Sequence, residues 1–335
     1  MIARAPKSIR KQIGITLVEL MVALAVGSFL MIGAIQIFGQ SRQAFVVNES
    51  IADVQDTAQF ALDTIENELR MANNWGRSSR SQLINGRAVA GDPNPNNLPA
   101  PADCGVGWAL DLALAVDGAN NRYTLPCLPR PAAQANSDVI TVRRASVQPV
   151  AVDAARLQIQ TTRIQGEIFS GSAPPAAFSV AVNPNTGSPA SSTHNLVVSS
   201  YYVASDSDLT PGVPTLRRKR LATYDGRPSV IDEEIAPGVE NIQLQLGIDI
   251  DNDNTVDRYV NPGDGIYDPG NTASYIPGAR VLTARIWLLV RGIRRENGIV
   301  DTRNYTPGDV HLGSYDDDYR RMQVSKTILL RNARI

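Results

Sequence analysis

The longest hydrophobic pattern in this chain is an almost uninterrupted apolar run from Ile15 to Phe38, which contains a single carboxylate, Glu19. At about 1.5 Å per helical residue, such a run is long enough to cross the roughly 30 Å of hydrocarbon in a bilayer. Residues 1–13 carry four basic side chains and no acid, so we expect them to stay in the cytoplasm. The pattern therefore predicts a transmembrane helix over residues 15–38.

Two ordinary interpretations of this run leave features unexplained. A secretory signal has an apolar core of about 7–15 residues followed by a small-x-small cleavage site. Here the small-x-small triplet Ala23-Leu24-Ala25 lies in the middle of the run. A plain membrane anchor does not account for Glu19, because a charge costs about 2.5–3.5 kcal/mol at the centre of a membrane helix and less near its end.

A helical pattern continues beyond the apolar run to about Asn73. Apolar residues recur at spacings of three and four, whereas the charged residues lie off this stripe. The sequence Asn73-Asn74-Trp75-Gly76 is typical of a helix end. We therefore expect residues 39–75 to continue the helix and to lay one face against a globular head. The stripe consists of Val47, Ile51, Val54, Ala58, Leu62, Ile65, Leu69 and Ala72.

The remaining residues, 76–335, predict a head domain built mainly of β-strands. Residues 76–136 are rich in Pro, Gly, Asn and Ala, and the stretch from Ser170 to Thr193 reads as a second surface loop. Strands without intervening helices favour an antiparallel sheet, so we expect an α+β fold with long loops. The expected strands are Val139–Arg143, Arg156–Ile164, Asn195–Ala204, Leu216–Tyr224, Val239–Ile248, Val281–Arg291 and Gln323–Leu330.

The start of the apolar run resembles the type IV prepilin family, in which a basic leader ends in Gly before an apolar residue, Thr, Leu, an apolar residue, Glu and Leu. The matching residues are Gly14-Ile15-Thr16-Leu17-Val18-Glu19-Leu20, with Ile15 where Phe or Met is commoner. The resemblance implies that residues 1–14 are a leader, that prepilin peptidase cleaves between Gly14 and Ile15, and that Ile15 is N-methylated. It also makes Thr16, Leu17 and Glu19 part of the assembly segment.

The same resemblance suggests a role for Glu19. An unpaired charge in an apolar surrounding costs several kcal/mol, and a carboxylate is the natural partner of a buried amine. In pilins this Glu is thought to meet the N-terminal amine of a neighbouring subunit. The residues leave open an intrachain contact or a contact with a lipid headgroup instead.

Three segments of the head look like the PilW-type minor pilins, namely Val239–Asp249, Ile286–Arg291 and Tyr319–Asn332, whereas residues 76–230 show no match. The resemblance implies a pilin-like fold and a minor pilin of the type IV pilus. Such a protein starts in the inner membrane, with its N-terminus in the cytoplasm and its head in the periplasm, and ends in the pilus on the cell surface. The implied partners are other minor pilins, the major pilin and a tip adhesin, in a complex that starts pili used for twitching and adhesion.

Two other functions stay open at this stage. The first is a type II secretion pseudopilin of the J type, and the second is a membrane-anchored binding module or adhesin. An enzyme is not expected, because the chain has only two histidines and no GxSxG, HExxH or phosphate-binding motif. The net charge of −1 gives no sign of a nucleic-acid partner. The strongest basic run, Arg217–Arg220, favours a solvated face or an edge strand over a binding patch.

Cys104 and Cys127 are the only cysteines, and both follow the membrane segment. In the oxidising periplasm we expect them to form one disulfide that closes a loop. A metal site at these cysteines is not expected, because the two histidines, His194 and His311, are far away in the sequence.

An acidic loop offers the one candidate metal site. Asp249, Asp251 and Asp253 alternate with other residues, and Asp257 follows four positions later. Calcium prefers six to eight oxygen ligands, and this spacing resembles the first part of an EF-hand loop, without its Gly and its final Glu. Asp and Asn clusters also form solvated hairpin turns, so the sequence leaves both interpretations open. No other cofactor is expected.

Overall fold

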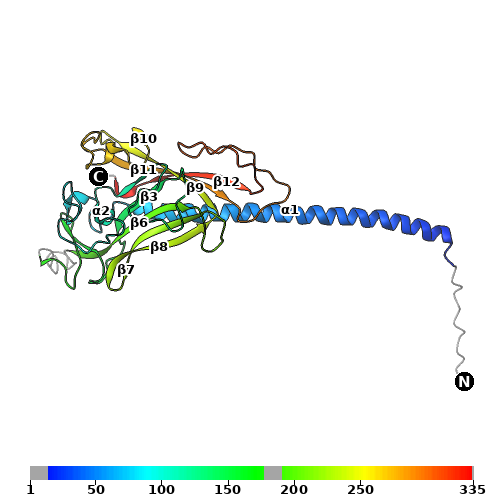
Figure 1. Cartoon of the computed structure of the whole chain (residues 1–335), viewed down its shortest axis with the longest axis horizontal. Helices are drawn as coiled ribbons and strands as arrows, with labels where there is room; N and C mark the ends of the chain where they lie inside the picture. The colour runs from blue at the N-terminus through cyan, green and yellow to red at the C-terminus, as the bar shows by residue number, and fades with distance from the viewer. Residues whose placement is uncertain (1–13, 177–190, 334–335) are drawn as a thin grey trace, which may run out of the picture. The chain divides into compact units, whose positions relative to one another are not determined.

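The computed structural model describes residues 14–176 and 191–333, and Figure 1 shows the course of the chain. The chain forms two compact units, and the boundary between them lies between Ser50 and Ile51. The second unit contains the end of helix α1 and the whole head. The part of the predicted loop Ser170–Thr193 that covers residues 177–190 lies outside the described residues.

Helix α1, Leu17–Met71, is continuous over 55 residues. In the described part of the chain it is the one helix long and apolar enough to cross a membrane. The predicted apolar stripe is buried from Val54 onward, whereas Val47 and Ile51 are only half-buried. The helix ends because Asn73 adopts a left-handed backbone with φ of 62°. Asn73 also donates a hydrogen bond to the Asn332 carbonyl at 3.0 Å, which ties the helix end to the end of the chain.

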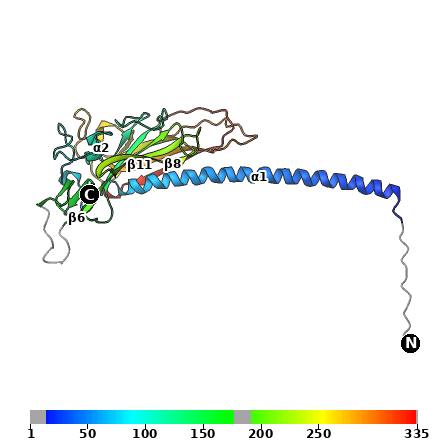
Figure 2. The ribbon, with the colours of Figure 1, turned by 60° about the horizontal axis from the view of Figure 1, so that its bottom comes forward.

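The head contains two β-sheets that lie alongside the part of α1 that belongs to the same unit, from Ile51 onward (Figures 1 and 2). The four-stranded sheet has the order β10-β9-β11-β12, and the eight-stranded sheet runs β1-β5-β4-β6-β3-β2, with β7 paired to β6 and β8 to β7. All pairs are antiparallel except β1 with β5, which confirms the mainly antiparallel α+β fold. The strands are β1 (Ile84–Asn85), β2 (Val116–Ala119), β3 (Val139–Ala145), β4 (Gln158–Thr161), β5 (Gly166–Phe169), β6 (Ser192–Ala204), β7 (Thr215–Tyr224), β8 (Arg227–Pro237), β9 (Val239–Asp249), β10 (Arg258–Val260), β11 (Arg280–Arg291) and β12 (Arg321–Leu329).

All seven predicted strands are present, whereas β1, β2, β5, β8 and β10 were not expected from the sequence. The longest of these is β8. It carries Asp232, Glu233 and Glu234 and is bounded by prolines, so its composition is unlike that of a buried strand. Its partner β7 holds the basic run Arg217–Arg220, and the two strands pair base against acid. The prediction that this basic run lies on an edge strand or a solvated face is therefore wrong, because β8 occupies the edge and Arg217 and Lys219 are buried.

The hydrophobic core has two main clusters. In the first, Ala58, Leu62 and Ile65 of α1 pack with residues of both sheets, such as Ile140 and Leu244. Burial of these side chains, at about 25 cal/mol per Å² of apolar surface, fixes the helix against the head. The second cluster surrounds Trp75, Trp108 and the two cysteines. The segment 76–136, which includes the short helix α2 (Val106–Leu110), therefore packs on a core that it shares with strands of the large sheet.

Ion pairs also join α1 to the two sheets of the head. Arg144 of β3 donates to both carboxylate oxygens of Glu68, with distances of 2.7 and 3.0 Å. Lys326 of β12 donates to Glu66, and this hydrogen bond holds the pKa of the Glu66 carboxyl below its usual value against the opposing effect of burial. Both sheets are thus joined to the helix by charged as well as apolar contacts.

A buried carboxyl, Asp138, joins the two sheets. Its Oδ1 accepts a hydrogen bond from the Asn121 backbone at 2.7 Å, and its Oδ2 accepts one from the Leu244 backbone of β9 at 2.7 Å. Burial raises the pKa of Asp138 to about 7, although the two backbone hydrogen bonds act in the opposite direction. The folded head therefore holds a proton at this position more tightly than the unfolded chain does.

The pKa of Asp138 predicts that the head loses stability as the pH rises from about 4 to 7. A group whose pKa is raised by folding stabilises the native state below its unfolded pKa, and this stabilisation is lost as the pH passes the folded value. Burial also raises the pKa of Asp111 and Asp117, which acts in the same direction. We expect the free energy of unfolding to fall by up to about 4 kcal/mol across this range. Urea titrations followed by tryptophan fluorescence should show a flatter pH dependence for Asp138→Asn; an unchanged slope would contradict the assignment.

Candidate functional site

The segment predicted for assembly forms the start of α1. Gly14, Ile15 and Thr16 are exposed and precede the first helical residue. The Thr16 backbone and hydroxyl both donate to Glu19 Oε2 at 2.9 Å, and the Glu19 backbone donates to Thr16 Oγ1 at 3.2 Å. This reciprocal arrangement is a capping box, which satisfies backbone donors at the helix start. The intrachain contact that the sequence left open is therefore present.

The capping box does not use all of the Glu19 carboxylate. Among the described residues, only its Oε2 atom accepts hydrogen bonds. Pairing of Glu19 with the amine of a neighbouring subunit therefore stays a prediction that the cap permits. Cleavage between Gly14 and Ile15 and methylation of Ile15 also stay predictions, since the leader up to residue 13 lies outside the described residues.

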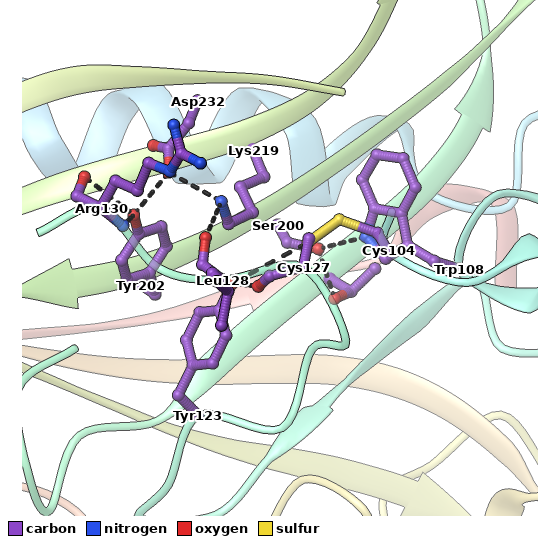
Figure 3. Close-up of a disulfide and its surroundings, with 11 residues drawn as sticks. Cys104, Trp108, Tyr123, Cys127, Leu128, Arg130, Ser200, Tyr202, Lys219 and Asp232 are labelled. Carbon is purple, nitrogen blue, oxygen red and sulfur yellow. Dashed lines mark hydrogen bonds and ion pairs between the residues drawn. A yellow bond between two sulfur atoms is a disulfide. The ribbon is translucent and has the colours of Figure 1, made fainter. Parts of the chain in front are cut away.

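The predicted disulfide is confirmed, because Cys104 and Cys127 are bonded to each other. Figure 3 shows the bridge between Trp108 on one side and Tyr123 on the other. Trp108 Nε1 donates to Ser200 Oγ at 2.8 Å, and the Tyr123 hydroxyl donates to the Cys127 carbonyl at 2.6 Å. The bridge thus closes a loop within the irregular segment 76–136, and the hydrogen bond from Trp108 to Ser200 attaches this loop to β6 of the large sheet.

Loss of the disulfide should destabilise the head by about 3 kcal/mol, because the closed loop restricts the unfolded chain. The variant is Cys104→Ser with Cys127→Ser, measured by urea unfolding of the full chain in nanodiscs. All three tryptophans, Trp75, Trp108 and Trp287, lie in the head and report its unfolding. Reduction of the native chain should produce the same shift and leave the double variant unchanged. A native-like midpoint for the double variant would contradict the prediction.

A charged cavity of about 920 Å³ lies beside the disulfide and includes Cys127 in its lining. Buried Lys219 donates to Asp232 at 2.7 Å and to the Leu128 carbonyl at 2.9 Å, and the Tyr202 hydroxyl donates to Asp232 at 2.7 Å (Figure 3). Arg217 contacts Asp208 and Asp232 at 2.7 and 2.9 Å. Bases and acids are matched in this cavity, so its charges stabilise the β7–β8 hairpin against the disulfide loop.

The acidic loop brings three of its four predicted ligands together. Carboxylate oxygens of Asp249, Asp251 and Asp257 lie within 4.8 Å of one another. Asp253 lies outside this group, and its Oδ1 accepts hydrogen bonds from the Thr255 backbone and hydroxyl at 2.7 and 2.6 Å. Buried Asp249 also accepts a hydrogen bond from Arg280 at 2.6 Å. The loop is a compact turn whose oxygens suit calcium, but Arg280 already neutralises its most buried carboxylate.

Calcium binding at this loop stays a prediction with a direct test. A bound ion should raise the melting temperature of the head, because a ligand that binds only the native state stabilises it by mass action. Asp251→Asn with Asp257→Asn should remove this shift, whereas Asp92→Asn with Asp316→Asn should keep it. Millimolar magnesium should act weakly, since it prefers a smaller octahedral site. No shift of the native chain at millimolar calcium would contradict the prediction.

A buried ionic network around Arg321 was not expected from the sequence. Arg321, at the start of β12, donates to Glu240 Oε2 at 2.6 Å and to Asp317 Oδ1 at 2.6 Å, and lies 3.4 Å from Asp301. Its guanidinium carbon lies 3.7 Å from the centre of the Tyr315 ring. The sequence predicts that the acidic run Asp316–Asp318 is a local charge-balanced loop. In the structure, Arg321 contacts Asp317 of this run and also contacts Glu240 of β9 and Asp301.

Two models of known protein families match this chain, one near each end. A family model described as Type IV Pilus-assembly protein W matches residues 200–332, which contain β7 to β12 and the Arg321 network. A second model, described as the prokaryotic N-terminal methylation motif, matches residues 9–35, which contain the capping box. No curated protein and no solved structure matches the chain significantly.

Proposed function

We propose that this chain, which belongs to the PilW-type minor pilins of the type IV pilus, joins a complex of minor pilins that starts the filament and occupies its tip. As a pilin it is a structural protein and not an enzyme. Helix α1 anchors it in the inner membrane before it becomes part of the surface pilus. It interacts with other pilus components and is processed by prepilin peptidase. We expect other minor pilins, the major pilin and a tip adhesin to be its partners.

One observation carries this proposal, namely that a processing motif and a PilW-type head occur in one chain. The size of the head supports a position at the tip. Residues 51–335 form one compact unit with two sheets on a single helix. A subunit at the end of a filament has neighbours on one side only, so a bulky head meets fewer steric limits there than within the shaft.

A deletion strain complemented with the native gene tests the proposal. Loss of surface pili, of twitching and of adhesion, all restored by the native gene, is the expected result. Normal pili with a loss of protein secretion would instead assign the chain to the J-type pseudopilins. Normal pili and normal secretion would contradict both assembly functions.

The mature N-terminus separates these assembly functions from a simple anchored adhesin. Mass spectrometry should find an N-methylated Ile15 in the membrane fraction. An intact leader, or cleavage after Ala25, would favour the adhesin. Co-purification of other minor pilins with the native chain from crosslinked membranes is expected, and their absence would contradict the proposed complex.

A further inference from the structure

An arginine-lined groove of about 610 Å³ lies at the turn that comes after the end of helix α1. One wall comes from the turn after the helix, and the other comes from the turn between β4 and β5. Three exposed arginines face this groove together with two serines and one exposed isoleucine. These residues are Arg77, Ser78, Ser79, Arg80, Arg163 and Ile164.

No carboxylate lines the groove among the described residues. Residues 72–91, which contain Arg77, Arg80 and Arg87, include no Asp or Glu, and neither do residues 154–166. Residues 177–190, outside the described part of the chain, contain no charged side chain at all. The groove is therefore a local concentration of positive charge in a chain whose net charge is −1.

Hydrogen bonds fix the backbone on both sides of the groove. The Trp75 backbone donates to the Ser78 carbonyl at 2.9 Å, and the Arg80 backbone donates to Ser78 Oγ at 3.1 Å. In the opposite turn, Thr162 Oγ1 accepts from the backbone of Gln165 at 3.1 Å. The arginines thus extend from ordered turns. Arg80 and Arg163 form no ion pair with any residue that the structure describes, so the fold itself does not use their charges.

We propose that this groove binds the phosphodiester backbone of DNA. The guanidinium group offers a planar fork of donors that fits phosphate oxygens, and it keeps its charge at all physiological pH values. Duplex DNA carries one negative charge per roughly 1.7 Å, so several arginines in one groove can engage it at once. The described lining contains no aromatic side chain for base stacking, which favours sequence-independent contact with a duplex.

This inference does not depend on the proposed place at the filament tip. It concerns one groove, whereas the expectation of no nucleic-acid partner came from the net charge of the whole chain. The test uses the full mature chain in nanodiscs of zwitterionic lipid and a fluorescein-labelled duplex of about two helical turns. Fluorescence anisotropy is measured between about 50 and 200 mM NaCl, because the salt dependence counts the phosphate contacts.

Arg80→Gln with Arg163→Gln should raise the Kd at least about tenfold at the lowest salt and reduce the slope of log K against log salt by about 2. The matched control is Arg122→Gln with Arg227→Gln, which removes the same charge from two exposed arginines elsewhere. The control should stay within about twofold of the native Kd.

Four results would overturn the proposal. The first is the absence of DNA binding by the native chain, and the second is an equal loss in both double variants. The third is displacement of DNA by polyglutamate as effectively as by unlabelled duplex, which would identify another anion as the ligand. The fourth is that Arg80→Gln with Arg163→Gln retains DNA binding but loses binding to phosphatidylglycerol vesicles.

Discussion

Glu19→Val should insert into the inner membrane as well as the native chain but should be nearly absent from filaments. Valine is more favourable in lipid than a carboxylate, so insertion does not suffer. In a filament, the variant would leave the N-terminal amine without its predicted partner. Breaking a buried pair by removing one member costs about 3–5 kcal/mol, which corresponds to a loss of incorporation of roughly a hundredfold or more. Immunoblots of sheared pili and of inner membranes measure the two amounts.

Glu19→Gln separates pairing from helix capping, since Glu19 also accepts hydrogen bonds from Thr16. Glutamine at this position preserves a capping box because its amide oxygen accepts the same hydrogen bonds, but it carries no charge. If the charge matters, Glu19→Gln should fail in filaments like Glu19→Val, whereas Thr16→Val should keep most of its incorporation. Normal incorporation of Glu19→Gln would contradict the ionic role and leave Glu19 as a capping residue.

The parts of the fold that could be predicted from the sequence are those specified by local patterns. The stripe from Val54 to Ala72 follows the helical period, and alternation in Ile242, Leu244 and Leu246 marks β9 as a strand. All of these side chains are buried in the structure. The disulfide was also predictable, because only two cysteines exist and both lie in an oxidising compartment.

The parts that could not be predicted depend on pairing between distant segments. Strand β8 is recognisable only beside β7, because its acids are matched by bases on the neighbouring strand rather than by any apolar pattern. Arg321 and Glu240 are separated by 81 positions, so no local spacing connects them. Likewise, the sequence places Asp253 among the calcium ligands, whereas the turn directs its oxygen to Thr255.

Arg321→Met should be the most damaging single substitution in the head. The Arg321 side chain is 1 % exposed, and Glu240 and Asp301 beside it are 6 % and 1 % exposed. Without the guanidinium, these carboxylates would be buried with incomplete compensation, at a cost of about 3–5 kcal/mol. The hydrogen bond from Arg321 also holds the pKa of the Asp317 carboxyl below its usual value, and this effect should disappear. Urea unfolding of the full chain measures the loss.

The network also fixes the long segment between β11 and β12. Residues 292–320 contain no strand, yet Glu296 and Asp301 donate backbone hydrogen bonds to Asp318 and Asp317 at 2.8 Å, close to Arg321. We therefore expect Arg321→Met to admit protease cleavage within this segment before the rest of the head unfolds. Exposed loops with few remaining contacts are the usual sites of such cleavage.

A second substitution tests whether buried charge is the cause. Glu240→Gln removes the carboxylate that Arg321 contacts through two hydrogen bonds of 2.6 and 3.1 Å. Combined with Arg321→Met, it should recover part of the lost stability, because replacing both members of a buried pair costs less than removing one. If the double variant is no more stable than Arg321→Met alone, packing of the Arg321 side chain on Tyr315 dominates and the charge argument is wrong. The double-variant cycle thus separates the two contributions in one set of measurements.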